Sequence, residues 1–487
     1  MTEAIVQPFL IAFVLAVALV PLCRRLAFRV DLVAHPRDDR WHRTSIPMLG
    51  GIAIGLATFG GSFITGIASE VPVFLGAAMV IFAVGLVDDM LNLKPSTKLV
   101  VQLAMASVLV AFDFRLNWVE SRLLDSGLTM VWIVGLTNAF NLLDNMDGLC
   151  AGTAVVVAMM MVAGLWTGVT RDIAGEEMAF LSLLAGAASG FLVYNFPPAS
   201  IFMGDCGSLM LGFSLAAMAL GSEGVRASRT DVLTVIVAPV FVLLIPIFDT
   251  TLVTAARILA GRSPAIGGRD HSSHRLVAIG LSERSAVFLL WGLAAMGGAI
   301  GLIVRNTTQG WSLIVGGLFL TLMGLFAVYL ARVRVYDDRV APPVRESRFT
   351  PLVNEFMHKR RVVEVIVDFV LIAAAYYFAN RWRFDVEAYA ANADNFYGSL
   401  PLVVSAQLVS FFVAGVYRGT WHYFVWRHAV TVLKGVALGV SGITLFVIAL
   451  YDYTADPKMI FVYYAVLVTL FVIASRAALR LFGQLLR

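Results

Sequence analysis

Charged residues are scarce in this sequence. Asp, Glu, Lys and Arg make up 14% of its 487 residues, whereas apolar residues make up 59%. A soluble globular domain carries about 25% charged residues. The chain therefore lacks the polar surface that water requires, and its composition predicts an integral membrane protein. The net charge of +4 is modest, so no nucleic-acid partner is expected.

Cysteine is rare as well. The three cysteines, Cys23, Cys150 and Cys206, lie far apart in or beside apolar segments. An odd number without a pairing pattern argues against a disulfide framework. The first apolar run follows residues 1–8 and has neither a preceding basic region nor a small-residue cleavage site. We therefore expect it to be a retained transmembrane helix rather than a signal peptide.

Long apolar runs occupy most of the chain. About 20 apolar residues cross the bilayer core as a helix, and helices are required because lipid cannot satisfy backbone polar groups. The hydropathy pattern predicts an all-α, polytopic transmembrane bundle of about 15 spans. These lie near 5–23, 49–67, 71–88, 98–113, 128–143, 149–167, 176–194, 205–221, 232–256, 285–304, 311–331, 363–380, 399–417, 430–451 and 459–480.

Basic residues predict the orientation of these spans. If the N-terminus lies outside, most of the 36 Lys and Arg residues fall in inside loops, as the positive-inside rule requires. We therefore expect the N-terminus outside and the C-terminus in the cytoplasm. The polar, proline-containing stretch 333–362 is predicted to be a cytoplasmic linker. It would join an eleven-span domain, 1–332, to a four-span module, 363–487.

Four polar clusters fall on the predicted cytoplasmic side. Ionisable residues in or at the ends of membrane helices are costly, so they are candidates for function. The first cluster is Asp88 and Asp89 at the end of the third span, with Lys98 at the start of the fourth. Two adjacent carboxylates repel each other, which raises the pKa of one of them and suits a base or a metal site. A helix end that meets water is the alternative.

The second cluster follows the fifth span. Asn141, Asp144 and Asp147 are spaced by three, so on a helix they lie roughly along one face. Residues 138–147 contain five amide or carboxylate side chains, a number that is difficult to explain by packing. A calcium-loop lookalike or a capped turn is the alternative.

The third cluster surrounds a Pro-Pro sequence after Asn195. A Gly-Asp-x-Gly-Ser turn then opens the eighth span, and the N–H groups of such a helix start suit phosphate oxygens. Asp205 is suited to Mg²⁺, which prefers carboxylate and phosphate oxygens. Phe202 is a candidate to stack on a nucleobase, although ordinary packing is the better explanation for this residue taken alone.

The fourth cluster is the long inner loop after the ninth span. It contains Arg269, His271, His274 and Arg275, and such side chains bind phosphate well. Zinc binding by the two histidines is disfavoured because no third ligand lies nearby. Asp249, at the inner end of the ninth span, is a candidate to join this cluster. Carboxylates and cations at one membrane face indicate a metal–diphosphate site that acts on a membrane-embedded acceptor.

The four clusters carry a specific resemblance. In order they read GLVDDMLNLKPSTKLVVQ, NAFNLLDNMDGLCAG, NFPPASIFMGDCGSLMLG and GRDHSSHRL. Over about 1–332 the chain resembles the polyprenyl-phosphate N-acetylhexosamine-1-phosphate transferases. These include the enzymes that start O-antigen, enterobacterial common antigen, teichoic acid or arabinogalactan linker synthesis, and the peptidoglycan translocase. The resemblance implies transfer of a sugar 1-phosphate from a UDP-N-acetylhexosamine to undecaprenyl or another polyprenyl phosphate, with release of UMP.

The resemblance also implies roles for individual residues. It makes Asp88, Asp89 and Asp144 the catalytic candidates, with Asp88 as a base on the acceptor phosphate. It makes Asp205 and Asp89 the ligands of Mg²⁺, with Mn²⁺ as the alternative. The remaining candidates would bind the two substrates: Lys98, Asn141, Asp147, Asn195, Phe202, Arg269, His271, His274 and Arg275.

The histidine loop departs from the family patterns. It reads His-Ser-Ser-His, whereas the translocase has three consecutive histidines and the common-antigen type has an HxHH pattern. This departure argues against a muramyl-pentapeptide substrate and leaves the hexosamine open, with N-acetylglucosamine as the first expectation. The resemblance further implies a multi-pass protein of the bacterial inner membrane, with its active site on the cytoplasmic face. A homodimer is a candidate assembly.

Residues 363–487 resemble a different family. HKRRVVEVIVDFVLIAAAYYF and FFVAGVYRGTWHYFVWRH are similar to the four-helix membrane part of polysaccharide-biosynthesis sugar-nucleotide dehydratases and epimerases. No G-x-G-x-x-G of a soluble nucleotide-binding domain follows, so this module is expected to carry no chemistry. It would dock a partner, a lipid or a second protomer.

Two other functions are compatible with parts of the sequence. A secondary transporter would place its site near the bilayer midplane on broken helices, often with inverted repeats. Here the charges gather at inner helix ends and no repeat is found. A catalytically inactive scaffold for polysaccharide assembly is compatible with the altered histidine loop, although all the aspartates are present. The transferase remains the expected function.

Overall fold

The part of the chain that the structure describes folds almost entirely into helices. The computed structural model describes residues 2–34, 45–167, 174–224, 238–259, 268, 270–306, 309–333, 360–417, 426–451 and 458–485. Within these ranges the exception is a pair of two-residue antiparallel strands, β1 (Val33–Ala34) and β2 (Ile46–Pro47). The prediction of an all-α, polytopic protein is confirmed.

Eleven of the described helices are long and apolar enough to cross a membrane. Three shorter apolar helices coincide with further predicted spans: Gly50–Ile64, Pro95–Ala111 and Asp205–Leu220. The predicted span 232–256 is described only from residue 238 onward. The orientation of the termini and the domain boundaries stay predictions.

The described helices fall into two compact units, and each is considered separately. The first unit comprises Met1–Asn92, Phe114–Glu120 and Val131–Glu355. The second comprises Leu93–Asp113, Ser121–Met130 and Phe356–Arg487. The two units therefore share helix α5 (Arg122–Leu143).

The first unit contains most of the predicted functional residues. Its helices, besides most of α5, are η1 (Thr2–Val6), α1 (Gln7–Arg29), α2 (Gly50–Ile64), η2 (Ile67–Ser69), α3 (Pro72–Leu91), α6 (Leu149–Thr167), α7 (Gly175–Asn195), α8 (Asp205–Gly224), α10 (Leu244–Leu259), α11 (Ser272–Ala278), α12 (Glu283–Asn306) and α13 (Gln309–Ala331).

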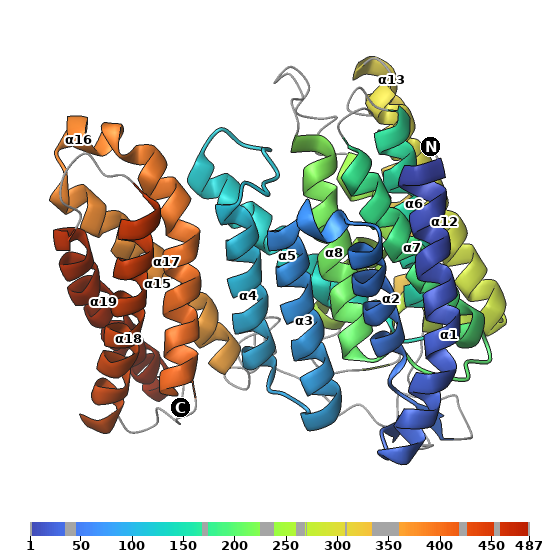
Figure 1. The fold of residues 1–487 in the computed structure, drawn as a ribbon, viewed down its shortest axis with the longest axis horizontal. Helices are drawn as coiled ribbons and strands as arrows, with labels where there is room; N and C mark the ends of the chain where they lie inside the picture. Colours follow the sequence, from blue (N-terminus) through green and yellow to red (C-terminus); the bar gives the residue numbers. More distant parts are fainter. Residues whose placement is uncertain are drawn as a thin grey trace. The chain divides into compact units, whose positions relative to one another are not determined.

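Helix α7 is surrounded by other helices of the first unit. It packs against α1, α2, α6 and α8, and α1 runs beside it (Figure 1). Almost every residue from Met178 to Phe191 is buried, as expected for a helix that is apolar around its whole circumference. A Cβ on Gly190 would lie 2.6 Å from the carbonyl oxygen of Phe13 on α1. Small residues therefore allow α1 and α7 to approach closely.

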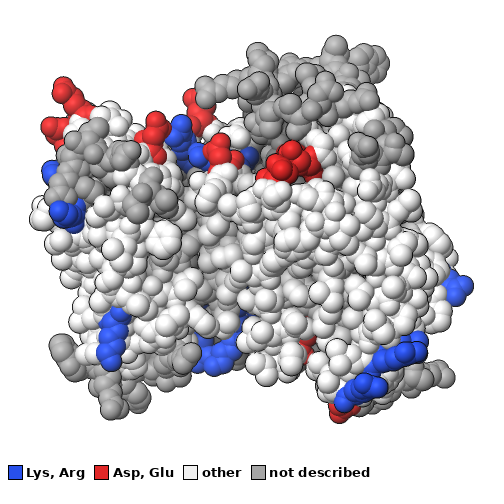
Figure 2. Space-filling view, viewed as in Figure 1, with Lys and Arg blue, Asp and Glu red and all other residues white. Residues whose placement is uncertain are grey.

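The outer surface of the first unit carries an uncharged band. On the face shown in Figure 2, no Lys, Arg, Asp or Glu interrupts the surface over the middle of α1, α2 and α3. Acidic side chains gather above this band, and basic side chains gather below it near the end of α1. Lipid tails require such an apolar belt, and its presence agrees with helices that span a bilayer.

The second unit combines the C-terminal helices with part of the N-terminal sequence. Its helices are α4 (Pro95–Ala111), α15 (Arg360–Arg383), α16 (Val386–Ala391), α17 (Ala393–Ala414), α18 (Trp426–Leu450) and α19 (Lys458–Leu485). Helix α4 packs against α17 and α15, and Ser405 donates its hydroxyl to the carbonyl oxygen of Ala104 at 3.2 Å. This unit therefore extends beyond the predicted module 363–487.

A buried ion pair joins two helices of the second unit. Arg476 Nη2 of α19 lies 2.6 Å from Asp368 Oδ2 of α15, and both side chains are almost fully buried. Removal of either partner would leave an uncompensated charge in an apolar interior, which is strongly destabilising. The pair therefore fixes the contact between α15 and α19.

Gly85→Ala should destabilise the first unit, because α3 and α8 approach closely at this residue. The added Cβ would lie 2.5 Å from Cys206 Cα and 2.7 Å from Asp205 O, both backbone atoms. Overpacking of this kind costs about 1–3 kcal/mol. The matched control is Gly76→Ala on the same helix, where a Cβ meets no atom within 4 Å. Thermal melting in detergent should show a lower melting temperature for Gly85→Ala alone, and equal melting temperatures would contradict the close packing.

Candidate active site

The carboxylate of Asp89 binds the start of helix α8. Asp89 Oδ1 accepts a hydrogen bond from Asp205 N at 2.7 Å, and Oδ2 accepts one from Cys206 N at 3.0 Å. The first N–H groups of a helix have no partner within that helix, and a negative charge is favourable there. Asp89 of α3 therefore anchors α8. The sequence predicted that the N–H groups at this helix start would be available to phosphate. Two of them, those of Asp205 and Cys206, instead donate to the carboxylate of Asp89.

Gly204 makes room for this contact. Its φ of +78° lies in the left-handed region, and a Cβ would lie 2.7 Å from an oxygen of the Asp89 carboxylate. Glycine is the residue that adopts this conformation without a steric penalty. The glycine of the Gly-Asp-x-Gly-Ser turn is therefore required by the position of Asp89.

Asn141 connects the end of α5 to the same helix start. Its Nδ2 donates to Asp205 Oδ1 at 2.9 Å and to Ser208 Oγ at 3.0 Å. The two helices approach closely, because a Cβ on Gly212 would lie 2.8 Å from the Cβ of Phe140. Asp89 of α3 and Asn141 of α5, both predicted site residues, therefore each contact a third one, Asp205, at the start of α8.

The loop after α5 is tied to the turn after α7. Asp147 Oδ2 accepts a hydrogen bond from Ala199 N at 2.8 Å. Asn195 Oδ1 accepts one from Gly148 N at 2.9 Å, while its Nδ2 donates to Ile201 O at 2.9 Å. Both ends of the buried Asn195 amide therefore contact backbone. These bonds hold the predicted second and third clusters together.

Backbone hydrogen bonds also fix the position of Phe202. Its N–H donates to Pro47 O at 2.8 Å, and its carbonyl oxygen accepts from Gly50 N at 2.9 Å. The half-buried side chain of Phe202 therefore extends from a backbone segment held between β2 and the start of α2.

Asp88, one residue before Asp89, is buried, with 8% of its surface exposed.

Negative charge accumulates around Asp144. Burial, and to a smaller extent the charges of Asp205, Asp89 and Asp147, together raise the pKa of this carboxyl to about 8. Four carboxylates therefore repel one another in this part of the site, a repulsion that a cation would relieve. In the described part of the chain, no three Asp, Glu, His or Cys side chains converge at the distances of a formed metal site.

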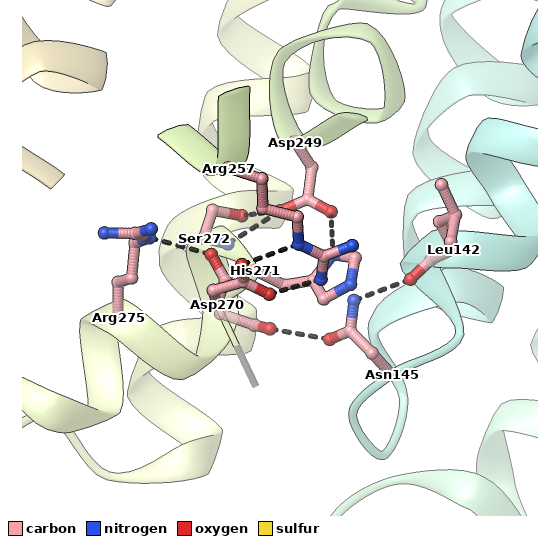
Figure 3. A network of polar contacts seen from close by, with 9 residues as sticks. Leu142, Asn145, Asp249, Arg257, Asp270, His271, Ser272 and Arg275 are labelled. Atoms are coloured by element: carbon pink, nitrogen blue, oxygen red, sulfur yellow. Dashed lines mark hydrogen bonds and ion pairs between the residues drawn. The ribbon is translucent and has the colours of Figure 1, made fainter. Parts of the chain in front are cut away.

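The histidine loop is held by two residues of α10 (Figure 3). Asp249 Oδ2 lies 2.7 Å from His271 Nδ1, and Arg257 donates from Nε to Asp270 Oδ2 at 2.7 Å and also from Nη2 to Oδ1. Burial acts to raise the pKa of Asp270, but the hydrogen bonds and charge of Arg257 outweigh it and hold the pKa below its usual range. The start of α11 is thus fixed by charged contacts.

Arg275 joins this loop to the end of α13. Its Nε donates to Asp270 O at 2.7 Å, and its Nη1 donates to the carbonyl oxygens of Leu330, Ala331 and Val333 at 2.8, 3.2 and 2.9 Å. The last carbonyl groups of a helix need such partners. The buried guanidinium of Arg275 therefore holds the histidine loop against the end of α13. Its contact with substrate stays a prediction.

The remaining predicted residues are placed as follows. The His274 ring lies beside His271, with 6.4 Å between the ring centroids. Lys98 belongs to α4 in the second unit. Arg269 lies outside the described residues.

Three residues of the polar network were not predicted to be site residues: Asn145, Arg257 and Asp270. Each lies in or at the edge of a cluster that was recognised. Their position in the sequence, close to predicted site residues, could have indicated them. Their contacts could not be predicted from the sequence. Asp249 was expected only as a candidate member of the fourth cluster. In the structure its carboxylate contacts both His271 and Ser272.

The fold and the site together define a polytopic membrane protein in which acidic and histidine-containing segments meet at the ends of helices. The sequence profile of glycosyl transferase family 4 matches residues 71–223. A Bacillus subtilis protein named "Probable undecaprenyl-phosphate N-acetylglucosaminyl 1-phosphate transferase" is 32% identical over 66% of this chain and 91% of its own length. The chain belongs to glycosyl transferase family 4.

Two further relatives show the range of this similarity. The decaprenyl-phosphate N-acetylglucosaminephosphotransferase of Mycobacterium leprae is 34% identical over 63% of this chain and 86% of its own length. The phospho-N-acetylmuramoyl-pentapeptide-transferase of Geobacillus kaustophilus is 28% identical over 62% of this chain and 97% of its own length. Each of these alignments leaves more than a third of this chain unmatched.

Asp144→Asn should stabilise the protein in the absence of divalent cations, and more so at high pH. An aspartate has a pKa of about 3.9 in an unfolded chain, whereas the pKa of Asp144 in the folded protein is about 8. Its ionisation therefore opposes folding increasingly as the pH rises between these two values. Asparagine carries no charge and avoids this cost. Melting temperatures in EDTA should differ more at pH 9 than at pH 5, and a difference independent of pH would contradict the electrostatic account.

Proposed function

We propose that the protein transfers N-acetylglucosamine 1-phosphate from a UDP-sugar to a polyprenyl phosphate and releases UMP. Two relatives with such names support this proposal, since each is at least 32% identical to this chain. The structural observation that supports it most is the junction of Asp89, Asn141 and Asp205. This junction joins three helices at a concentration of negative charge, which is suited to a cation and a diphosphate.

The proposed reaction joins the two substrates through their phosphates. An oxygen of the polyprenyl phosphate attacks the β-phosphorus of the UDP-sugar. The bond between this phosphorus and the oxygen that bridges to the α-phosphate breaks, so UMP leaves and a polyprenyl diphosphate sugar remains. Asp88 is the candidate base that takes the proton from the lipid phosphate, and Asp89 and Asp144 are the neighbouring catalytic candidates. Phosphoryl transfer of this kind relies on positioning and on electrostatic stabilisation.

Mg²⁺ is the proposed cofactor, with Mn²⁺ as the alternative. Asp205 and Asp89 would hold it, and it would neutralise charge on the diphosphate. The residues fit such a cation in chemistry, because Mg²⁺ prefers oxygen ligands. They also fit in charge, because a cation would relieve the repulsion among the carboxylates, which adds to burial in raising the pKa of Asp144.

The remaining predicted residues are assigned to substrate binding. Phe202 is proposed to lie beside the uracil, since its backbone is fixed on both sides. Asn141, Asp147 and Asn195 would arrange the site around the UDP-sugar. The cationic and histidine side chains proposed to bind phosphate are Lys98, Arg269, His271, His274 and Arg275. UDP-N-acetylglucosamine is the proposed donor and undecaprenyl phosphate the proposed acceptor.

The proposed location is the bacterial inner membrane, with the active site on the cytoplasmic face. The apolar helices and the relation to polyprenyl-phosphate enzymes support a membrane protein of this kind. The product would start a cell-surface glycan. We propose a homodimer as the protein's assembly.

The experiment that tests the proposal is UMP release by the purified full-length protein in detergent. The expected result is release that requires both undecaprenyl phosphate and Mg²⁺ together with UDP-N-acetylglucosamine. Asp205→Asn should lower the rate by about a hundredfold or more, because electrostatic stabilisation by one group contributes about that factor. No release with any UDP-hexosamine would contradict the proposal and would favour the scaffold. Release that needs no lipid would contradict the assignment of the acceptor.

A further inference from the structure

The start of α11 is held by two segments that lie far from it in the sequence (Figure 3). One is α10, through Asp249. The other is the loop after α5, through Asn145. Asp249 was predicted only as a candidate member of the fourth cluster, and Asn145 was not predicted as a site residue. Asp249 contacts the predicted residue His271, and Asn145 contacts Ser273, which precedes the predicted residue His274. This arrangement connects the histidine loop to the acidic loop 144–148 within the first unit.

Asp249 sets the orientation of His271. Its Oδ2 lies 2.7 Å from Nδ1 of the imidazole, while its Oδ1 accepts from Ser272 N at 2.7 Å and from Ser272 Oγ at 2.6 Å. Both oxygens of the buried carboxylate are therefore engaged. An ionised carboxylate accepts hydrogen bonds and donates none, so Nδ1 carries a hydrogen and Nε2 is the nitrogen left for another partner.

Asn145 connects α11 to the loop that contains Asp144 and Asp147. Its Oδ1 accepts a hydrogen bond from Ser273 Oγ at 2.6 Å, and its Nδ2 donates to Leu142 O at 2.7 Å. The second bond satisfies the carbonyl group of Leu142, because carbonyl groups in the last turn of a helix have no N–H partner within that helix. One amide therefore holds the end of α5 and the start of α11 at a fixed separation.

We propose that Asp249 and Asn145 are positioning residues of the transfer reaction. Asp249 directs Nε2 of His271, and Asn145 keeps that imidazole in a fixed position relative to the aspartates of loop 144–148. The donor diphosphate is then held between the two loops in one geometry. This inference rests on the proposed function, because it assigns His271 to the phosphate groups of the same substrates.

A purely structural role for Asp249 makes a different prediction. If the carboxylate only caps the start of α11, asparagine would replace it, because an amide oxygen also accepts hydrogen bonds from Ser272 N and Oγ. If the carboxylate orients His271, asparagine fails, because its Nδ2 is a donor and favours the opposite imidazole tautomer. Asp249→Asn therefore separates the two roles.

The first test is a double-mutant cycle of Asp249→Asn and His271→Gln. We expect Asp249→Asn to lower kcat/KM by about 10- to 100-fold, the range for loss of a hydrogen bond to a charged group. The melting temperature and the chromatographic profile should stay close to those of the wild type. In the His271→Gln background, Asp249→Asn should cause no further loss, because its effect passes through the imidazole.

The second test is the cycle of Asn145→Ala and Ser273→Ala. Each should lower kcat by about 3- to 10-fold, as expected for one neutral hydrogen bond. The double variant should be no slower than the slower single variant. The matched control is Ser282→Ala, which removes a serine hydroxyl that contacts Ser285 instead of loop 144–148. This control should stay within about twofold of the wild type, since surface changes have small effects.

The outcomes distinguish this inference from the proposed function. A wild-type protein without lipid-dependent UMP release contradicts both. A wild-type protein that is active, with Asp249→Asn equally active, contradicts the positioning role alone. Additive losses in Asp249→Asn and His271→Gln would likewise show that Asp249 acts without the imidazole. Additive losses in the Asn145 and Ser273 cycle would show that the two residues do not act through their hydrogen bond and would contradict the positioning role of Asn145.

Discussion

A carboxylate placed at the start of a helix from another segment organises the first unit. Asp89 leaves the last turn of α3 and accepts the N–H groups of Asp205 and Cys206. An unsatisfied polar group in an apolar surrounding costs several kcal/mol, so these contacts define where α8 begins. Asn141 then binds Asp205 and Ser208 on the same helix, so α5 is placed by α8 in turn. Glycines at the contacts allow the backbones to approach this closely.

The same type of contact recurs at the histidine loop. Asp249 of α10 accepts the N–H and hydroxyl groups of Ser272 at the start of α11, and it also contacts His271. A carboxylate in this role provides both a hydrogen-bond acceptor and a fixed negative charge. Burial of such groups, together with their mutual repulsion, makes the site costly to fold, in line with the raised pKa of Asp144. Functional sites commonly retain a destabilising arrangement because binding of the ligand relieves it.

Several features could be predicted from the sequence because few physical alternatives exist. Lipid leaves helices as the main spanning structure, so apolar runs predicted the all-α fold. The three-residue spacing of Asn141, Asp144 and Asp147 suggested one face of a helix, but α5 ends at Leu143, so Asp144 and Asp147 lie in the turn that follows. Asn141 and Asp147 nevertheless contact the third cluster. Ionisable residues in apolar segments are conspicuous, which is why Asp89 and Asp205 were recognised.

Other features depend on side-chain directions that a sequence does not show. Asn195 was expected to bind substrate, yet its amide contacts the backbone of Gly148 and Ile201. Arg275 was expected to bind phosphate, yet its guanidinium contacts carbonyl groups of α13. Helix α4 follows α3 directly in the sequence but belongs to the second unit. In each case a long-range contact decides the arrangement, and local patterns carry no information about it.

The mass of the lipid product tests the central claim most directly. The purified protein would be given undecaprenyl phosphate and UDP-N-acetylglucosamine, and the extracted lipid would be analysed by mass spectrometry. Our account predicts undecaprenyl diphosphate bearing one N-acetylhexosamine, with UMP as the nucleotide product in equal amount. A lipid monophosphate bearing the sugar, together with UDP, would show that the sugar is transferred without its phosphate and would contradict the account.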